Sequence, residues 1–126
     1  MQLPYLYIKK TATKGRGVFT LEDIPEGTLI EIAPVLVLPT ADRKKIDDSF
    51  LYNYYFLWHE GHTHYAIAFG YASLYNHDYD ANCIYETYYE EEEIHIITNR
   101  AIKAGEELTI NYNGEPDCKD KVWFDK

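Results

Sequence analysis

The stretch LYNHDYDANC, residues 74–83, carries the pair Asn76-His77 and, a few positions on, an Asn-Cys pair. A second stretch, GEELTINY at residues 105–112, begins with a glycine turn, continues as a short apolar strand and ends on a tyrosine. An Asn-His pair alone is a weak signal, because polar pairs are common in turns. The two stretches together, both in the C-terminal half of the chain, form a much more specific pattern.

A third motif, Lys14-Gly15-Arg16-Gly17, lies near the N-terminus. The three motifs, in this order across nearly the whole chain, resemble those of the SET-domain protein lysine methyltransferases. The resemblance implies a minimal stand-alone SET domain over residues 1–126, with 113–126 as a C-terminal flanking segment. It also implies a mainly β fold of several short-stranded sheets with one or two short helices. In that fold the Asn-His stretch and the C-terminal stretch thread together in a C-terminal pseudoknot.

The composition predicts one soluble domain. A chain of 126 residues has room for one core, and a domain of that size buries roughly two-thirds of its unfolded surface. No apolar run approaches the ~18 residues that cross a bilayer, and the N-terminus carries no basic and apolar leader. We therefore expect no membrane partner and a cytoplasmic location by default, with nuclear targeting left open. Cys83 and Cys118 are expected to be free thiols there.

The chain is acidic, with a net charge of −9 and a pI near 4.9. Binding to nucleic acid needs clustered Lys and Arg, so we expect no direct nucleic-acid partner. An acidic chain suits a basic partner, although the charge can equally serve solubility alone. The resemblance makes that partner a lysine-bearing protein or peptide, such as a histone. A homodimer is also compatible with the many aromatic residues.

The residue pattern predicts a succession of short strands and one helix. Four strands are expected at residues 5–9, 18–19, 28–33 and 35–38, the last two divided by Pro34. Two hairpins are expected, one joining 55–58 to 63–69 through Glu60-Gly61 and one joining 83–89 to 94–98 across the acidic residues 90–93. The helix is expected over 40–54, with Thr40 or Asp42 as its cap and an apolar face of Ile46, Phe50, Leu51 and Tyr54.

The glycine motif is a candidate ligand site. Two glycines around one residue let the backbone approach a ligand with no Cβ between them, although Gly-X-Gly between strands is more often only a tight turn. In SET domains the corresponding segment lines the pocket for S-adenosylmethionine. The resemblance therefore assigns Lys14, Gly15, Arg16 and Gly17 to that cofactor.

Asn76 and His77 are expected on irregular backbone, where polar groups are available to bind a ligand, although they could be turn residues only. By resemblance, the Asn76 side chain meets the amino acid end of the cofactor and the His77 backbone meets the adenine edge. The family usually has serine and proline where this chain has Asp78 and Ala81. The loss of proline removes a constraint on the loop, and Asp78 adds a negative charge near a cationic cofactor.

Tyr112 is the predicted catalytic residue, because SET enzymes place their active-site tyrosine at this position. The implied reaction is an in-line displacement, in which a neutral lysine amine attacks the methyl carbon of the sulfonium and S-adenosylhomocysteine leaves. The Tyr112 hydroxyl is expected to orient the amine. A phenol with a pKa near ~10 is mostly protonated at neutral pH, so we do not assign it as the general base.

A lysine channel is predicted from Tyr75, Tyr85, Ile110 and Tyr112. Tyr85 lies two residues after Cys83, on the same strand face, and core packing is its alternative role. In the family the residue at position 110 often controls how many methyl groups are added. Here it is isoleucine, so the product count stays open. Trp123 is assigned to the cofactor as an aromatic cover, with docking of an apolar tail on the core as the alternative.

Three histidines, His59, His62 and His64, lie close together, but no further ligand stands near them at zinc spacing, so we expect no metal site. Two alternatives to an enzyme remain. One is a non-catalytic SET-fold module that recruits a partner protein. The other is a small tyrosine-rich scaffold whose motifs match by chance.

Overall fold

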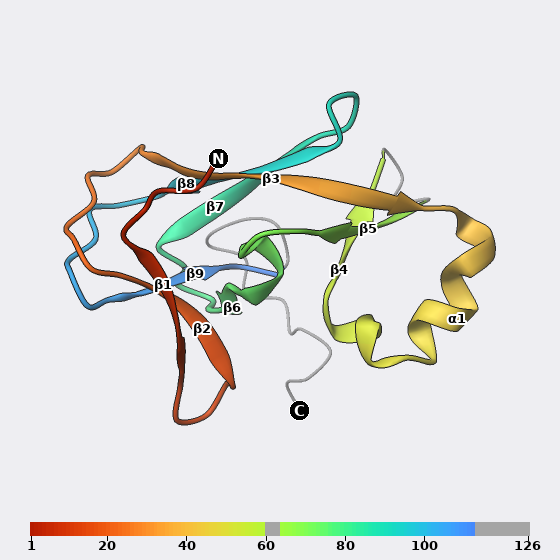
Figure 1. Cartoon of the computed structure of the whole chain (residues 1–126), viewed down its shortest axis with the longest axis horizontal. Helices are drawn as coiled ribbons and strands as arrows, with labels where there is room; N and C mark the ends of the chain where they lie inside the picture. The colour runs from red at the N-terminus through yellow and green to blue at the C-terminus, as the bar shows by residue number, and fades with distance from the viewer. Residues whose placement is uncertain (60–63, 113–126) are drawn as a thin grey trace.

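The structure is a computed structural model that describes residues 1–59 and 64–112. Its strands form a four-stranded sheet in the order β1-β2-β9-β6 and a five-stranded sheet in the order β4-β5-β3-β8-β7 (Figure 1). The strands are β1 (Leu6–Lys10), β2 (Arg16–Thr20), β3 (Leu29–Leu38), β4 (Tyr55–Trp58), β5 (His64–Ala68), β6 (Asn76–His77), β7 (Cys83–Tyr88), β8 (Glu93–Thr98) and β9 (Glu107–Ile110). The helical segments are η1 (Thr40–Asp42), α1 (Arg43–Asp47), η2 (Phe50–Asn53) and η4 (Ala72–Leu74). The mainly β class is confirmed.

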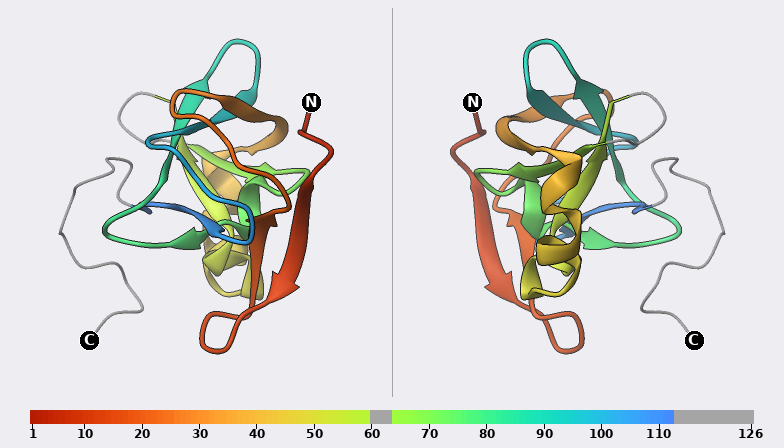
Figure 2. Two further views of the ribbon diagram at one scale, coloured as in Figure 1. Left: turned by 90° about the vertical axis from the view of Figure 1, so that its left-hand side faces the viewer. Right: turned by 90° about the vertical axis from the view of Figure 1, so that its right-hand side faces the viewer.

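The four-stranded sheet brings the three sequence motifs together. β1 and β2 form a hairpin in which Gly15 adopts a φ of 71°, a conformation that glycine tolerates best. β9 pairs antiparallel with β2 and parallel with β6, so that Asn76 lies opposite Thr109 and His77 opposite Ile110. Figure 2 shows β9 (blue) and β6 (green) side by side, next to the red β1–β2 hairpin. The expected meeting of the two C-terminal stretches is confirmed.

The prediction of irregular backbone at residues 76–77 is wrong, because these residues form strand β6. A two-residue strand leaves no periodic signal in the sequence, and this one exists only because β9 supplies its partner.

Both predicted hairpins are present in the five-stranded sheet, since β4 pairs antiparallel with β5 and β7 pairs antiparallel with β8. Glu90, Glu91 and Glu92 are exposed at the tip of the second hairpin, as expected for the acidic stretch, whereas Glu93 already belongs to β8. The predicted turn at 60–61 lies outside the described residues.

β3 is one continuous strand, where the sequence predicts two strands divided by Pro34. It pairs with β8 up to Pro34 and with β5 from Val35 onward. The Pro34 carbonyl accepts a hydrogen bond from the Phe69 N–H at 3.0 Å, one residue beyond the end of β5. The N–H that Pro34 lacks would therefore lie beyond the end of β5, where no strand needs it as a donor. For this reason β3 continues through Pro34.

Residues 40–54 form three short helical segments, so the prediction of one helix is wrong. α1 ends at Asp47, and the Ser49 side chain accepts a hydrogen bond from the N–H of Leu51 and so begins a separate segment. Ile46 is buried as the predicted face requires, but Phe50 and Leu51 are 75% and 45% exposed. The predicted caps fail as well, because neither η1 nor α1 has a side-chain capping hydrogen bond.

The core is built from apolar side chains of both sheets, among them Trp58, Ile94, Ile96 and Leu108. Cys83 lies in this core as a free thiol, and burial raises its pKa to about 12, so it stays protonated at neutral pH. Cys118 lies outside the described residues. Within the ranges that the structure describes, no helix is long and apolar enough to cross a membrane.

Candidate active site

A cavity of about 300 Å³ lies where the three motifs meet. Six of the residues that the sequence singled out line it, namely Lys14, Gly15, Arg16, Asn76, His77 and Tyr112. Four more residues line it that sequence reasoning missed, namely Thr13, Tyr54, Ser73 and Leu74. Thr13 adjoins the glycine motif, so extending that motif by one residue would have found it, whereas Leu74 begins the 74–83 stretch without an assigned role. Tyr54 and Ser73 carry no comparable signal.

Gly17, in β2, lies at the closest approach of three segments. The Asn76 amide nitrogen donates to the Glu107 carboxylate at 2.7 Å and to the Arg16 carbonyl at 3.3 Å. A Cβ on Gly17 would lie 2.8 Å from that nitrogen and would overlap the Glu107 carboxylate. Because both amide hydrogens of Asn76 are donated within the protein, its Oδ1 is the atom that it can offer to a ligand.

His77 contributes both its backbone and its ring. Its carbonyl accepts a hydrogen bond from Lys14 Nζ at 2.6 Å. Its ring Nδ1 accepts from the backbone N–H of Tyr112 at 2.9 Å, which assigns the ring proton to Nε2 in the neutral form. The ring also lies edge-on to Tyr79, with centroids 4.4 Å apart. His77 therefore fixes the backbone of the predicted catalytic tyrosine.

Tyr112 reaches the cavity just beyond the end of β9. Its hydroxyl donates to the backbone carbonyl of Tyr75 at 2.9 Å. Burial, with smaller contributions from Tyr54 and Glu107, raises the pKa of this hydroxyl to about 12, so it is protonated at neutral pH. The hydroxyl is therefore protonated, with its hydrogen donated to the Tyr75 carbonyl, so toward a ligand its oxygen can act only as an acceptor.

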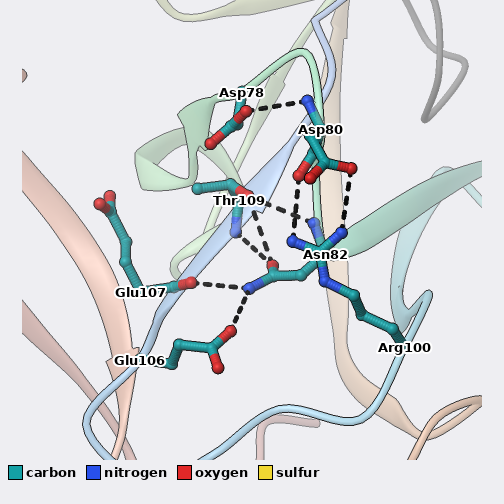
Figure 3. A network of polar contacts seen from close by, with 7 residues as sticks. All are labelled: Asp78, Asp80, Asn82, Arg100, Glu106, Glu107 and Thr109. Carbon is teal, nitrogen blue, oxygen red and sulfur yellow. Dashed lines mark hydrogen bonds and ion pairs between the residues drawn. The ribbon is translucent and has the colours of Figure 1, made fainter.

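Asn82 ties the end of the 74–83 stretch to β9 (Figure 3). Its Oδ1 accepts from the Thr109 N–H and its Nδ2 donates to the Glu107 carbonyl, both at 2.8 Å. The side-chain amide thus pairs with β9 as the peptide group of a neighbouring strand would. Nδ2 also donates to the Glu106 carboxylate at 3.2 Å, and the residue is only 3% exposed.

The loop between β6 and Asn82 contains both departures from the family pattern. Asp78 accepts a hydrogen bond from the N–H of Asp80 at 2.8 Å, which closes an Asx turn. Arg100 donates to the carboxylate and to the carbonyl of Asp80, both at 3.1 Å (Figure 3). These hydrogen bonds restrain the loop next to the buried Ala81, the position at which the family usually has a proline.

The remaining predicted site residues do not line the cavity. The Tyr75 side chain points into the core, where it is 1% exposed, so only its carbonyl reaches Tyr112. Ile110 is buried in β9, and Tyr85 packs against Phe56 with ring centroids 5.3 Å apart. Trp123 lies outside the described residues. The lysine channel and the cover over the cofactor stay predictions.

The histidine cluster is partly described. The His59 and His64 rings contact each other edge-on at 4.7 Å, and His62 lies outside the described residues. Among residues 1–59 and 64–112, no three His, Cys, Asp or Glu side chains are grouped so that they could hold a metal ion.

The arrangement of these motifs defines a class of protein. The SET domain family matches residues 15–113, and the chain belongs to that family. The chain is 37% identical over 121 residues to the histone-lysine N-methyltransferase, H3 lysine-37 specific, of Schizosaccharomyces pombe, a match that covers 95% of this chain and 77% of the relative. A crystal structure of a Plasmodium falciparum protein assigned as a histone methyltransferase matches with a TM-score of 0.67 and 25% identity, over 96% of this chain and 97% of that one.

Proposed function

We propose that the protein is a protein-lysine N-methyltransferase that uses S-adenosylmethionine and acts on a lysine of a basic protein such as a histone. The observation that carries this proposal is the convergence of Asn76, His77 and Tyr112 on one cavity through the pairing of β6 with β9. The similarity to the Schizosaccharomyces pombe histone methyltransferase supports it over nearly the whole chain.

The residues around the cavity fit S-adenosylmethionine. The His77 carbonyl accepts an N–H donor from Lys14, and the exocyclic amine of adenine is a donor of the same kind. Asn76 Oδ1 is suited to the ammonium group of the methionine part, and the lack of a Cβ at Gly17 lets Asn76 and Glu107 lie close to the backbone there. When bound, the cofactor would supply a sulfonium methyl group that passes to the lysine amine, with S-adenosylhomocysteine as the leaving group and one proton lost to water.

Gly17→Ala is expected to raise the dissociation constant for S-adenosylmethionine about tenfold or more. The added Cβ must displace Asn76 and Glu107, which moves Asn76 Oδ1 away from the ammonium group, and losing a hydrogen bond to a charged group costs about 1.5–3 kcal/mol. Isothermal titration calorimetry measures the effect. Gly27→Ala is the control away from the cavity, because nothing lies within 4 Å of its added Cβ; since Gly27, unlike Gly17, has a positive φ of 78°, it shows what backbone strain alone does to the dissociation constant. An unchanged dissociation constant in folded Gly17→Ala would contradict the assignment.

The chain's own contribution to the reaction is orientation and desolvation. A lysine amine in water has a pKa near ~10.4, so making it neutral at pH 7 costs roughly 4–5 kcal/mol. A partly buried site lowers this cost, and holding the reacting groups in line contributes on the order of 7 kcal/mol. In this proposal Tyr112, whose hydroxyl donates to the Tyr75 carbonyl, orients the incoming amine.

The transfer rate is expected to rise with pH from about 7 to about 9.5, as more of the substrate amine becomes neutral. Tyr112 adds no step in this range, because its pKa is raised to about 12 and the hydroxyl keeps its proton throughout. A pH–rate profile of the wild type and of Tyr112→Phe tests this, and the two curves should share one shape at different heights. A falling limb in this range that Tyr112→Phe abolishes would show that the hydroxyl ionises.

The function itself is tested by incubating the protein with labelled S-adenosylmethionine and either histones or lysine-rich peptides. Mass spectrometry of the products is expected to show methylated lysines, and the modified site names the substrate. Saturable cofactor binding without any transfer would favour the non-catalytic recruiting module instead. Absence of both would contradict the proposed function, although a chance match of the motifs is already excluded by membership of the SET domain family.

The charge of the chain and the relative's name support a basic protein as the partner. A chain with a net charge of −9 attracts basic proteins, and the Schizosaccharomyces pombe relative is named for a histone lysine. Self-association stays a prediction that light scattering of the purified chain would test. The cytoplasmic or nuclear location also stays a prediction.

A further inference from the structure

A buried carboxylate stands outside the cavity and has no part in the reaction described above. Glu31 lies on β3, in the five-stranded sheet, and is only 1% exposed. Its Oε1 accepts from the Tyr75 hydroxyl at 2.8 Å, and its Oε2 accepts from the Tyr71 N–H at 2.8 Å. Gln2 Nε2 lies 3.5 Å from the same Oε2, at the limit of a hydrogen bond.

These bonds hold both ends of the turn that leads into β6. Tyr71 precedes η4 and Tyr75 follows it, so one carboxylate from the other sheet fixes the whole of 71–75. Gly70 allows this close approach, because a Cβ there would overlap the Glu31 carboxylate. Two lining residues of the cavity, Ser73 and Leu74, lie within the same turn.

Tyr75 connects this anchor to the reacting end of the site. Its side chain is held by Glu31, while its backbone carbonyl accepts the Tyr112 hydroxyl at 2.9 Å. Any shift of Tyr75 therefore moves the acceptor that orients the Tyr112 O–H bond. Burial raises the pKa of the Tyr75 hydroxyl well above its ordinary value, so this hydroxyl remains a donor to Glu31.

We propose that Glu31 is a positioning residue, which acts through Tyr75 to hold the carbonyl that orients the Tyr112 hydroxyl toward the substrate amine. The inference rests on the proposed function, because it assigns Glu31 a part in the same reaction. An ionised carboxylate can accept from both donors at once, one on each oxygen. A glutamine side chain would turn its NH₂ group toward one of them.

The test compares Tyr75→Phe and Glu31→Gln with the wild type in methyl transfer to a lysine peptide. Each variant is expected to lower kcat about tenfold, which is the rate effect of losing one hydrogen bond of ordinary strength. The dissociation constant for S-adenosylmethionine, measured by calorimetry, is expected to stay within about twofold. The double variant is expected to lose no more than the more affected single variant, because both changes break the same connection.

Tyr88→Phe is the matched control. It removes the same kind of bond, from a tyrosine hydroxyl to the Glu86 carboxylate at 3.2 Å, on the exposed side of β7. It is expected to leave kcat unchanged. A drop as large as that of Tyr75→Phe would show that the assay responds to any lost hydroxyl and would overturn the proposal.

Three results would overturn the positioning role of Glu31. The first is full kcat in folded Tyr75→Phe, and the second is a double variant with the product of the two single effects. The third is a loss of cofactor affinity equal to the loss of kcat, which indicates a general loosening of the turn. If Glu31→Gln does not fold, the kcat of Tyr75→Phe alone tests the positioning role. A folded wild type that transfers no methyl group refutes the proposed function itself, and this is seen before any variant is compared.

Discussion

Tyr112→Phe is expected to lower kcat for lysine methylation by about 10²- to 10³-fold, the size of effect that follows from removing one preorganised hydrogen-bonding group from an active site. The phenyl ring keeps its place, because the contact with the His77 ring, at 5.2 Å between centroids, needs no hydroxyl. What disappears is the O–H group that the Tyr75 carbonyl holds in one direction. Without the hydroxyl, no group from Tyr112 orients the amine for in-line attack on the methyl carbon.

Steady-state kinetics with a lysine peptide, combined with calorimetry for S-adenosylmethionine, separates this effect from a loss of binding. The dissociation constant for the cofactor should change by less than about threefold, because the cofactor contacts assigned above come from Lys14–Gly17 and β6. Full activity of Tyr112→Phe would remove the tyrosine from the mechanism. A large loss of cofactor affinity would instead place the hydroxyl in the binding site.

Asn82→Ala is expected to lower the free energy of unfolding by about 2–5 kcal/mol. The substitution leaves the Thr109 N–H and the Glu107 carbonyl of β9 without the amide that satisfies them, and each such buried group costs about 1–3 kcal/mol. Water does not readily reach these two groups to replace the hydrogen bonds of the amide, because Asn82 is only 3% exposed. The stability of the whole domain therefore depends on one side chain in the loop.

Urea denaturation followed by fluorescence measures this loss. Asn99→Ala serves as the control, because its side chain is exposed, and it should change stability by less than about 0.5 kcal/mol. An effect below about 1 kcal/mol in Asn82→Ala would mean that the loop relaxes to supply other partners. The peptide-like pairing would then be dispensable.

The hairpins could be predicted from sequence because their signal is local. β8 alternates in burial with a period of two, and β7 and β8 flank an acidic turn, so neighbours in sequence are also neighbours in space. β6 could not be predicted in the same way, since its two residues become a strand only through pairing with β9. The continuity of β3 through Pro34 likewise depends on where β5 ends, which is a property of the sheet and not of the strand.

The contrast between local signals and contacts made only in the folded chain also explains which site residues were predicted and which were missed. Asn76, His77 and Tyr112 belong to motifs that can be recognised in one dimension. Tyr54 follows η2, in the segment misjudged as part of one helix, and it comes to the cavity only through the fold. Glu31 gave no signal either, because a glutamate within an apolar run becomes notable only when its burial and its donors are known.

The place of β9 between β2 and β6 has a consequence for how the protein matures. β2 is synthesised long before β9, so the edge of β2 that β9 later covers stays open on the ribosome and can pair with other chains. Contacts as distant as that of Val18 with Leu108 also give the domain a high contact order, which slows folding. The yield of native protein in a cell therefore depends on how well this edge of β2 is shielded until β9 pairs with it.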